Sequence, residues 1–326
     1  MLYIYNKSTN PYFNLATEEY LLKNFDEDIF MLWRNAPCIV VGKNQNTLSE
    51  INLNYVKDNN IIVVRRLSGG GAVFHDLGNL NFTFILKDGS ENFSDFKKFT
   101  IPIIDVLKGL SIDAKFEGRN DITIDGKKIS GNAQYSYKGK LLHHGTLLFS
   151  SNMVDLSAAL NVKPSKFEGK SVKSVKSRVT NIEEHLIKPM SIEDFIDLIM
   201  KHIIKQYGGN NLYEFNESDI KSIEKLTEEK YSTWEWNFGA SPKYSFKNEK
   251  KFDGGNVELF LNVERGIIKD VYFYGDFFSK NDVSEIEKAL IGIRHKEDDI
   301  KGVLESFKIE DYFSNISEKN LLELFF

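Results

Sequence analysis

The chain has 326 residues and a net charge of −5, with 41% hydrophobic and 27% charged residues. These values are typical of an ordinary soluble protein with a large core and room for two domains. The negative charge argues against a general nucleic-acid-binding protein, and the single cysteine, Cys38, excludes an intramolecular disulfide. No apolar run is long enough to span a membrane, so we expect a cytoplasmic protein that binds neither nucleic acid nor membrane.

The first third of the sequence alternates short apolar runs with a helical segment. We expect a helix at 13–25 with Asn14 as its cap, strands at 29–34 and 38–41, a short helix at 50–59, and strands at 61–66 and 79–86. The last of these strands places Leu80, Phe82 and Phe84 on one face and Asn79, Asn81 and Thr83 on the other. One face should meet the core and the other a polar space.

Antiparallel hairpins dominate the middle of the chain. The sequence predicts a helix at 93–109, a strand at 114–116, a hairpin turn at Asp125-Gly126, strands at 127–137 and 141–149, a basic loop at 163–178, and helices at 192–207 and 217–229. This order predicts an α+β fold rather than regular βαβ units. A hairpin at 256–263 and 267–274 with short helices after it indicates a second domain, with a boundary near 240–248.

The glycine-rich segment from Arg65 to Asp76 is the most informative stretch. Three glycines let the backbone approach a ligand closely, and free N–H groups beside two arginines suit an anion such as phosphate. A plain connection between two strands is the alternative interpretation. The segment is no dinucleotide-binding motif, because Phe74 stands at the last glycine position, and Gly169-Lys170-Ser171 lacks the upstream glycine of a phosphate-binding P-loop.

The strand at 128–134 is the second informative place. Regular alternation puts Lys128 on one face with Ser130, Asn132 and Gln134, and that face meets either solvent or a polar pocket. A lysine there could hold a phosphate or carboxylate and stabilise charge that develops in a transition state.

Metal-centred and covalent chemistry find little support in the sequence. His143 and His144 point to opposite faces of their strand, so they do not chelate one ion together. Ser68 lies in no nucleophile elbow, and Cys38 sits in an apolar strand where a cysteine is usually a small buried hydrophobe.

Separated motifs, taken jointly, resemble the lipoate–protein ligase A family. They are Arg65-Arg66-x-Ser68-Gly-Gly-Gly-Ala-Val-Phe-His-Asp-x-Gly78-Asn79, Gly118-Arg119-Asn120-Asp121, Lys128-Ile-Ser-Gly131, His143-His144-Gly145-Thr146, Ser177-Arg178-Val179-Thr180-Asn181 and Trp234-Glu235-Trp236-Asn237-Phe238-Gly239. The resemblance to the bacterial two-domain form implies a biotin/lipoate-ligase-like catalytic domain at 1–243, with a mixed, largely antiparallel sheet and surrounding helices. It also implies a small α+β accessory domain at 244–326.

The resemblance implies a two-step reaction. Lipoate and MgATP give lipoyl-AMP, and the lipoyl group then passes to a lysine of a lipoyl domain of a 2-oxoacid dehydrogenase E2 subunit or of glycine-cleavage H protein. Lys128 matches the essential catalytic lysine, which also contacts lipoate together with Gly70 and His144. Asp121 is the candidate Mg²⁺ ligand, and 168–180 matches a loop that folds over the adenylate. The implied ATP- and adenylate-binding residues are Arg66, Ser68, Gly71, Ala72, Val73, Phe74, Asn79, Asp121, Lys128, Arg178, Val179 and Thr180.

Two alternatives stay open at this point. An octanoyl- or lipoyl-amidotransferase of the same fold would work through an acyl-cysteine, although Cys38 lies outside the matching motifs. A non-catalytic module could bind lipoyl domains or nucleic acid through the basic loop at 163–178. A biotin ligase is expected to carry a Gly-Arg-Gly-Arg-type loop, which Arg65–Gly71 is not. The sequence does not distinguish lipoate from octanoate as the donor.

Overall fold

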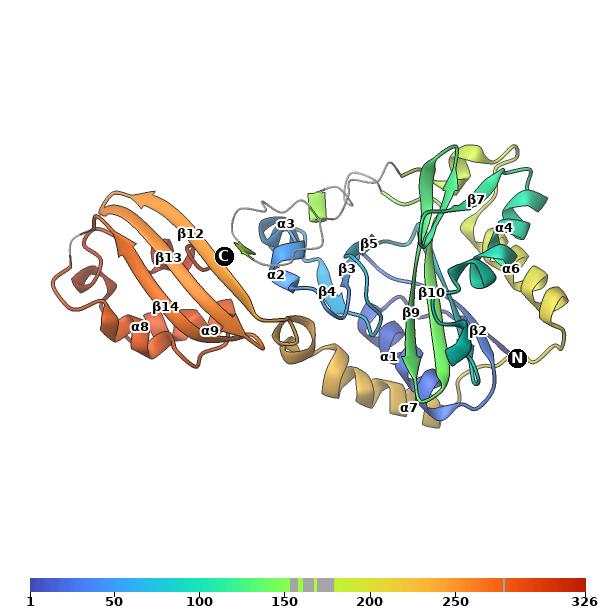
Figure 1. Cartoon of the computed structure of the whole chain (residues 1–326), viewed down its shortest axis with the longest axis horizontal. Helices are drawn as coiled ribbons and strands as arrows, with labels where there is room; N and C mark the ends of the chain where they lie inside the picture. The colour runs from blue at the N-terminus through green and yellow to red at the C-terminus, as the bar shows by residue number, and fades with distance from the viewer. Residues whose placement is uncertain (153–157, 161–166, 169–178, 278) are drawn as a thin grey trace. The chain divides into compact units, whose positions relative to one another are not determined.

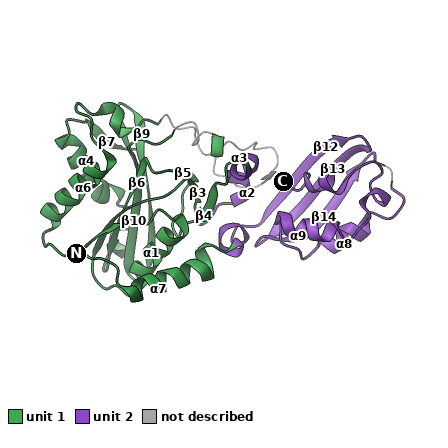
Figure 2. Ribbon diagram, turned by 180° about the vertical axis from the view of Figure 1, so that it is seen from behind, with its two compact units in different colours: residues 1–43, 58–160, 173–233 green, residues 44–57, 161–172, 234–326 purple. Residues whose placement is uncertain are grey.

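A computed structural model describes residues 1–152, 158–160, 167–168, 179–277 and 279–326, and its contacts divide the chain into two units (Figure 2). The first unit comprises 1–43, 58–160 and 173–233, and the second comprises 44–57, 161–172 and 234–326. The predicted α+β class is confirmed, whereas the domain boundary at residue 243 stays a prediction. None of the helices in these ranges is long and apolar enough to cross a membrane.

A seven-stranded sheet forms the centre of the first unit (Figure 1). Its strands lie in the order β1 (Leu2–Asn6), β2 (Ile29–Arg34), β6 (Asn79–Leu86), β10 (Lys140–Leu148), β9 (Lys127–Tyr137), β8 (Asp121–Ile124) and β7 (Ala114–Glu117). β1 and β2 pair in parallel and the other neighbours pair antiparallel. Asp125-Gly126 has positive φ values, as the predicted tight hairpin turn requires, and so does Lys138-Gly139 between β9 and β10.

One face of this sheet carries the hydrophobic core. The helices α4 (Phe96–Gly109) and α6 (Ile192–Tyr207) cover it (Figure 1), and they pack against Leu80, Phe82 and Phe84 of β6. Because side chains alternate along a strand, the polar residues of β6 point to the opposite face. The predicted division of β6 into an apolar and a polar face is therefore confirmed.

The helix α1 (Pro11–Asn24) lies on the polar face of the sheet, where Glu18 accepts a hydrogen bond from Thr83 of β6. Its cap is Asn10, whose side chain accepts from the N–H groups of residues 12 and 13. The prediction of Asn14 as cap was wrong, because proline at the first helical position lets the helix begin earlier. Asn14 is buried and donates to Asn35 and to two carbonyl groups.

A small three-stranded sheet, also in the first unit, carries the glycine-rich segment. Its order is β4 (Ile62–Arg65), β3 (Cys38–Val41) and β5 (Val73–His75), with β3 parallel to β4 and antiparallel to β5. The glycine-rich segment connects β4 to β5 across β3. Cys38 is fully buried in β3, as predicted for a small hydrophobic side chain.

A buried carboxylate joins α1 to the end of the first unit. The helix α7 (Glu217–Leu226) continues as a π-helical segment at Thr227–Tyr231. There Lys230 and Tyr231 donate to Glu19 of α1, at 2.5 and 2.6 Å, and Lys23 donates to the same carboxylate. Burial raises the pKa of Glu19, but these hydrogen bonds outweigh it and hold the pKa below its ordinary value.

The second unit contains an antiparallel sheet packed on short helices. Its elements are α2 (Thr47–Glu50), α3 (Leu53–Asp58), β11 (Phe167–Glu168), β12 (Tyr244–Phe252), β13 (Gly255–Glu264), β14 (Ile267–Gly275), α8 (Ser284–Leu290), α9 (Glu297–Leu304) and α10 (Glu318–Leu322). The predicted helix at 50–59 is thus two short helices. The strand β12 was not predicted, because its apolar alternation stops after Phe246 and lysines follow.

Candidate active site

The side chain of Arg66 organises the glycine-rich loop. Its Nη2 donates to the carbonyl groups of Gly69 and Gly71, at 2.7 and 2.8 Å, its Nη1 to Val40, and its Nε to Ser68 Oγ at 3.1 Å. In a trans peptide the C=O and N–H groups point in opposite directions. The N–H groups that follow these two carbonyls therefore point away from the guanidinium, as a loop that receives an anion requires.

Two positions in this region favour glycine, Gly70 for its backbone conformation and Gly42 for lack of space. Gly70 has a φ of 96°, in the left-handed region that other residues rarely adopt. A Cβ atom on Gly42 would lie 2.2 Å from the carbonyl oxygen of Gly70. The loop is therefore packed directly on the backbone of residue 42.

Both arginines of the motif carry buried charges. Arg65 is fully buried and donates to the carbonyls of Gly42 and Lys43, and Arg66 is 6% exposed. Burial lowers the pKa of each guanidinium to about 10, so both stay charged at neutral pH. Two neighbouring buried guanidinium groups make the surroundings of the loop positive. The site is consequently suited to an anionic ligand.

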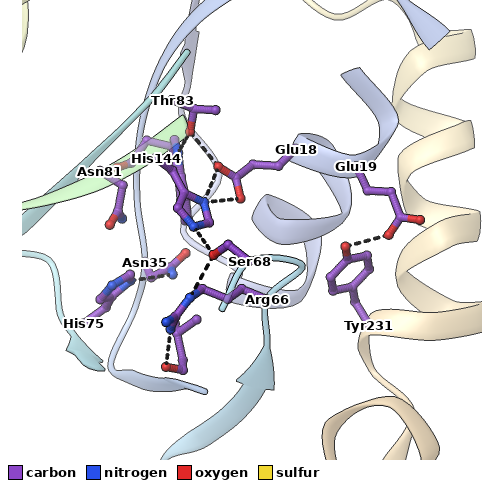
Figure 3. A network of polar contacts seen from close by, with 12 residues as sticks. Glu18, Glu19, Asn35, Arg66, Ser68, His75, Asn81, Thr83, His144 and Tyr231 are labelled. Atoms are coloured by element: carbon purple, nitrogen blue, oxygen red, sulfur yellow. Dashed lines mark hydrogen bonds and ion pairs between the residues drawn. The ribbon is translucent and has the colours of Figure 1, made fainter. Parts of the chain in front are cut away.

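A chain of hydrogen bonds runs from the glycine loop to α1 (Figure 3). Ser68 Oγ lies 2.6 Å from His144 Nε2, and His144 Nδ1 lies 3.0 Å from both carboxylate oxygens of Glu18. Thr83 donates to Glu18 at 2.6 Å, and Trp33 Nε1 donates to Thr83 at 2.9 Å. This chain joins α1, β6, β10 and the loop on the polar face of the sheet.

The arrangement of Ser68, His144 and Glu18 resembles a Ser-His-acid triad, but Ser68 is not placed as a nucleophile. Its side chain is fully buried, and its oxygen already accepts a hydrogen bond from Arg66. Nucleophilic catalysis requires a hydroxyl that reaches the substrate. We therefore interpret these residues as a positioning network.

Lys128 reaches the polar face because of a β-bulge. The pairing of β8 with β9 shifts by one residue between Ile122 and Thr123, which leaves Ile129 as the extra residue. The end of the Lys128 side chain consequently lies over Gly131, where an added Cβ would be 2.9 Å from Nζ. The prediction that Lys128 shares a face with Ser130 was wrong, since strict alternation assumes a strand without a bulge.

The polar residues that follow Lys128 on β9 are buried on the core side instead. Asn132 and Gln134 contact the two ring nitrogens of His143, at 3.1 and 3.2 Å, and the ring of His143 stacks on Phe99 at 4.5 Å. Burial lowers the pKa of His143 well below its ordinary value, so the ring is neutral. This cluster satisfies buried polar groups, and it is neither the solvent-exposed face nor the pocket considered from the sequence. His143 and His144 lie on opposite faces of β10, as predicted.

Asp121 contacts the Lys128 ammonium at 2.8 Å. Both side chains are partly exposed, and the pairing register places Asp121 beside Gly131 across β8 and β9. The ranges that the structure describes contain no group of three or more potential metal-ligating side chains. One carboxylate fits Mg²⁺ that is held mainly by phosphate oxygens and water.

Three further expected residues, Asn79, Val179 and Thr180, border the same region. Asn79 is fully buried, its Nδ2 donates to Asn81, and its Oδ1 has no hydrogen-bond partner among the described residues. Thr180 N donates to the carbonyl of Lys128 at 3.1 Å, and Val179 pairs with Lys128. Arg178 and the other residues of 169–178 in the expected loop lie outside the described residues.

Glu18 was missed by the sequence reasoning. It stands in α1 next to Glu19, and each carboxylate is at most 3% exposed. Two consecutive glutamates in a helical segment usually mark a solvated face. The two glutamates could be recognised as buried only if the whole helix were known to be buried, and the local sequence does not show this.

Comparisons with known proteins agree with this fold and site. Residues 10–204 match the family described as lipoyl protein ligase A/B catalytic domain, and residues 241–325 match bacterial lipoate protein ligase C-terminus. Together these two matches cover most of the chain. The chain therefore belongs to the lipoate–protein ligase family, and the resemblance found in the sequence is confirmed.

Three of the individual relatives below match the chain over nearly its full length, and a fourth matches about three quarters of it. Lipoate-protein ligase LplJ of Bacillus subtilis is 46% identical over 100% of both chains. Lipoate–protein ligase 1 of Staphylococcus aureus is 44% identical over 98% of each chain. P. falciparum LipL1 in complex with lipoate has a TM-score of 0.62 at 30% identity, covering 99% of this chain and 97% of its own. A lipoate-protein ligase A bound with ATP has a TM-score of 0.64 at 28% identity, covering 73% of this chain and 98% of its own.

Proposed function

We propose that this lipoate–protein ligase activates lipoate with ATP to lipoyl-AMP and then transfers the lipoyl group to a lysine of an acceptor protein. The observation that supports this proposal best is the position of Lys128. The bulge at Ile129 turns its ammonium to the polar face of the sheet that His144 and the glycine loop also border. A cation at that point can bind a carboxylate and the α-phosphate together and stabilise the negative charge that develops between them.

The glycine loop is proposed to hold the nucleotide phosphates. Arg66 serves this role by fixing the loop carbonyls, which leaves the opposite backbone N–H groups for the anion. The Oδ1 of Asn79, which has no hydrogen-bond partner among the described residues, is proposed to accept from a donor of the nucleotide. The complete proposed set is Arg66, Ser68, Gly71, Ala72, Val73, Phe74, Asn79, Asp121, Lys128, Arg178, Val179 and Thr180.

Lipoate is proposed to contact Lys128 through its carboxylate, with Gly70 and His144 beside the acyl chain. Mg²⁺ is proposed to bind Asp121 and the phosphates of ATP, where it would neutralise phosphate charge. Lys128 contacts the Oδ1 of Asp121, so the second carboxylate oxygen is the one proposed for the metal.

The acceptors that we propose are lipoyl domains of 2-oxoacid dehydrogenase E2 subunits, glycine-cleavage H protein, or both. A relative from Thermoplasma acidophilum, described as a bi-partite lipoate protein ligase, was studied together with its E2 lipoyl domain. That match has a TM-score of 0.65 at 30% identity. The E2 lipoyl domain of that relative supports the first of these acceptors.

An amidotransferase mechanism fits this chain poorly. Such an enzyme needs an accessible cysteine thiolate, and Cys38 is fully buried in β3. Burial raises the pKa of its thiol, so the thiolate does not form at neutral pH. The adenylate route needs no cysteine.

The experiment that tests the proposal is ATP–pyrophosphate exchange with lipoate, octanoate or biotin, followed by transfer to a lipoyl domain and to H protein. Exchange with lipoate or octanoate is expected, and exchange with biotin alone would contradict the assignment. Lys128→Ala should abolish both exchange and transfer. Lys127→Ala is the matched control, because this neighbouring lysine is exposed and should leave both steps unchanged.

A further inference from the structure

The guanidinium of Arg66 lies at one end of a continuous chain of hydrogen bonds, and its countercharge lies at the other. Within the described ranges Arg66 forms no direct ion pair, and it is 6% exposed. The carboxylate whose charge acts on the guanidinium belongs to Glu18, which is 3% exposed and is separated from Arg66 by Ser68 and His144.

With a neutral His144 ring, the carboxylate of Glu18 gives each hydrogen bond in this chain one direction. An ionised carboxylate only accepts, so His144 Nδ1 carries the hydrogen that it shares with Glu18. His144 Nε2 is then the acceptor for the Ser68 hydroxyl, whose oxygen accepts from Arg66 Nε. Thr83 also donates to the Glu18 carboxylate (Figure 3), and its own oxygen accepts from Trp33 Nε1.

We infer that Glu18 is a positioning residue for the nucleotide loop, acting through His144 and Ser68 on the guanidinium of Arg66. The carboxylate fixes the His144 tautomer, the tautomer fixes the direction of the Ser68 hydroxyl, and Ser68 holds Arg66 Nε. Arg66 then keeps the carbonyls of the glycine loop turned inward. The inference rests on the proposed function, because it takes this loop as the phosphate site.

Glutamine at residue 18 keeps the shape of the side chain but changes the direction of the hydrogen bonds between residue 18 and Arg66. Glutamine has an N–H donor where the carboxylate has an oxygen, so it offers a donor to His144 Nδ1 and favours the other tautomer. His144 Nε2 would then donate to Ser68, so the Ser68 oxygen has to accept from both His144 and Arg66 while its own hydrogen loses its acceptor, which weakens its hold on Arg66 Nε. The loop loses its fixed conformation before ATP binds, and ATP binding has to restore it.

The test compares four variants with the wild-type chain: Glu18→Gln, Ser68→Ala, the double variant, and Glu19→Gln. Glu19 is the matched control, because it is the adjacent carboxylate of α1 and equally buried, yet its partners are Lys23, Lys230 and Tyr231. Calorimetry measures the Kd for ATP without lipoate, exchange kinetics measures the KM values for ATP and lipoate, and ¹⁵N NMR reports the His144 tautomer.

We expect Glu18→Gln and Ser68→Ala each to raise the Kd for ATP about tenfold, since each removes a charge-assisted hydrogen bond from one chain. The double variant should bind ATP no more weakly than the single variant with the higher Kd, because substitutions within one series of hydrogen bonds do not have additive effects. Glu18→Gln should also shift the His144 hydrogen to Nε2. Glu19→Gln should lower stability and leave the Kd for ATP unchanged.

An unchanged Kd in folded Glu18→Gln, additive effects in the double variant, or an equal rise in Glu19→Gln would overturn the inference. A wild-type chain that binds no ATP and shows no exchange would instead overturn the proposed function. The two failures are therefore distinguished by the wild-type measurement.

Discussion

Gly131→Ala is a sharp test of the position of Lys128. The new Cβ would lie 2.9 Å from Lys128 Nζ and 3.1 Å from Cε, whereas non-bonded carbon contacts settle at about 3.5–4.0 Å. The ammonium must therefore move by roughly 0.5–1 Å. A displacement of about 1 Å at a reacting centre costs on the order of 10²-fold in rate. We expect the kcat of ATP–pyrophosphate exchange to fall about tenfold to a hundredfold.

Stability should change little in the same variant. The atoms that give way belong to the flexible end of a lysine, and alanine restricts the unfolded chain, so the free energy of unfolding should change by less than about 1 kcal/mol. Gly302→Ala is the matched control, because no atom lies within 4 Å of its added Cβ and the residue stands inside α9. A Gly131→Ala enzyme with the kcat of the wild type would refute the catalytic placement of Lys128.

Three other predictions concern the loop, the cysteine and α1. Gly42→Ala should weaken ATP binding and destabilise the fold by about 1–3 kcal/mol, because its Cβ meets the Gly70 carbonyl at 2.2 Å; calorimetry and urea unfolding check this. Cys38→Ala should keep exchange and transfer activity and cost about 1–2 kcal/mol of stability, and loss of transfer alone would revive the acyl-cysteine route. The lowered pKa of Glu19 contributes stability above its ordinary value of 4.5, and this contribution is lost as the pH falls through the folded-state pKa. Glu19→Gln should therefore be less stable at pH 7 and show a shallower loss of stability in acid, and an unchanged acid-unfolding curve would contradict this.

The helix α1 has two separate roles in this protein. Glu18 contacts the His144 side of the site, and Glu19 binds the segment that ends the first unit. Adjacent residues of a helix point about 100° apart, so two consecutive acids can serve two different surroundings. The helix is buried on nearly all sides, which explains why its sequence shows no amphipathic period.

Local patterns in the sequence were sufficient to predict much of the fold. The alternation of Leu80 and Phe82 with Asn79 and Asn81 predicted both faces of β6, and the two-residue turns predicted the hairpins of β8, β9 and β10. Period-two alternation and turn chemistry depend on neighbouring residues, so they can be read without knowledge of the partner strands. The motifs around the glycine loop and Lys128 identified the family on the same basis.

Only the tertiary structure decided how the site is assembled. The bulge at Ile129 depends on the register between β8 and β9, and it places Lys128 on the face opposite to the one that alternation predicts. The contacts of Ser68 with His144, and of His144 with Glu18, join residues 76 and 126 positions apart. Contacts at such separations arise from how the sheets and α1 pack, and no local period in the sequence encodes them.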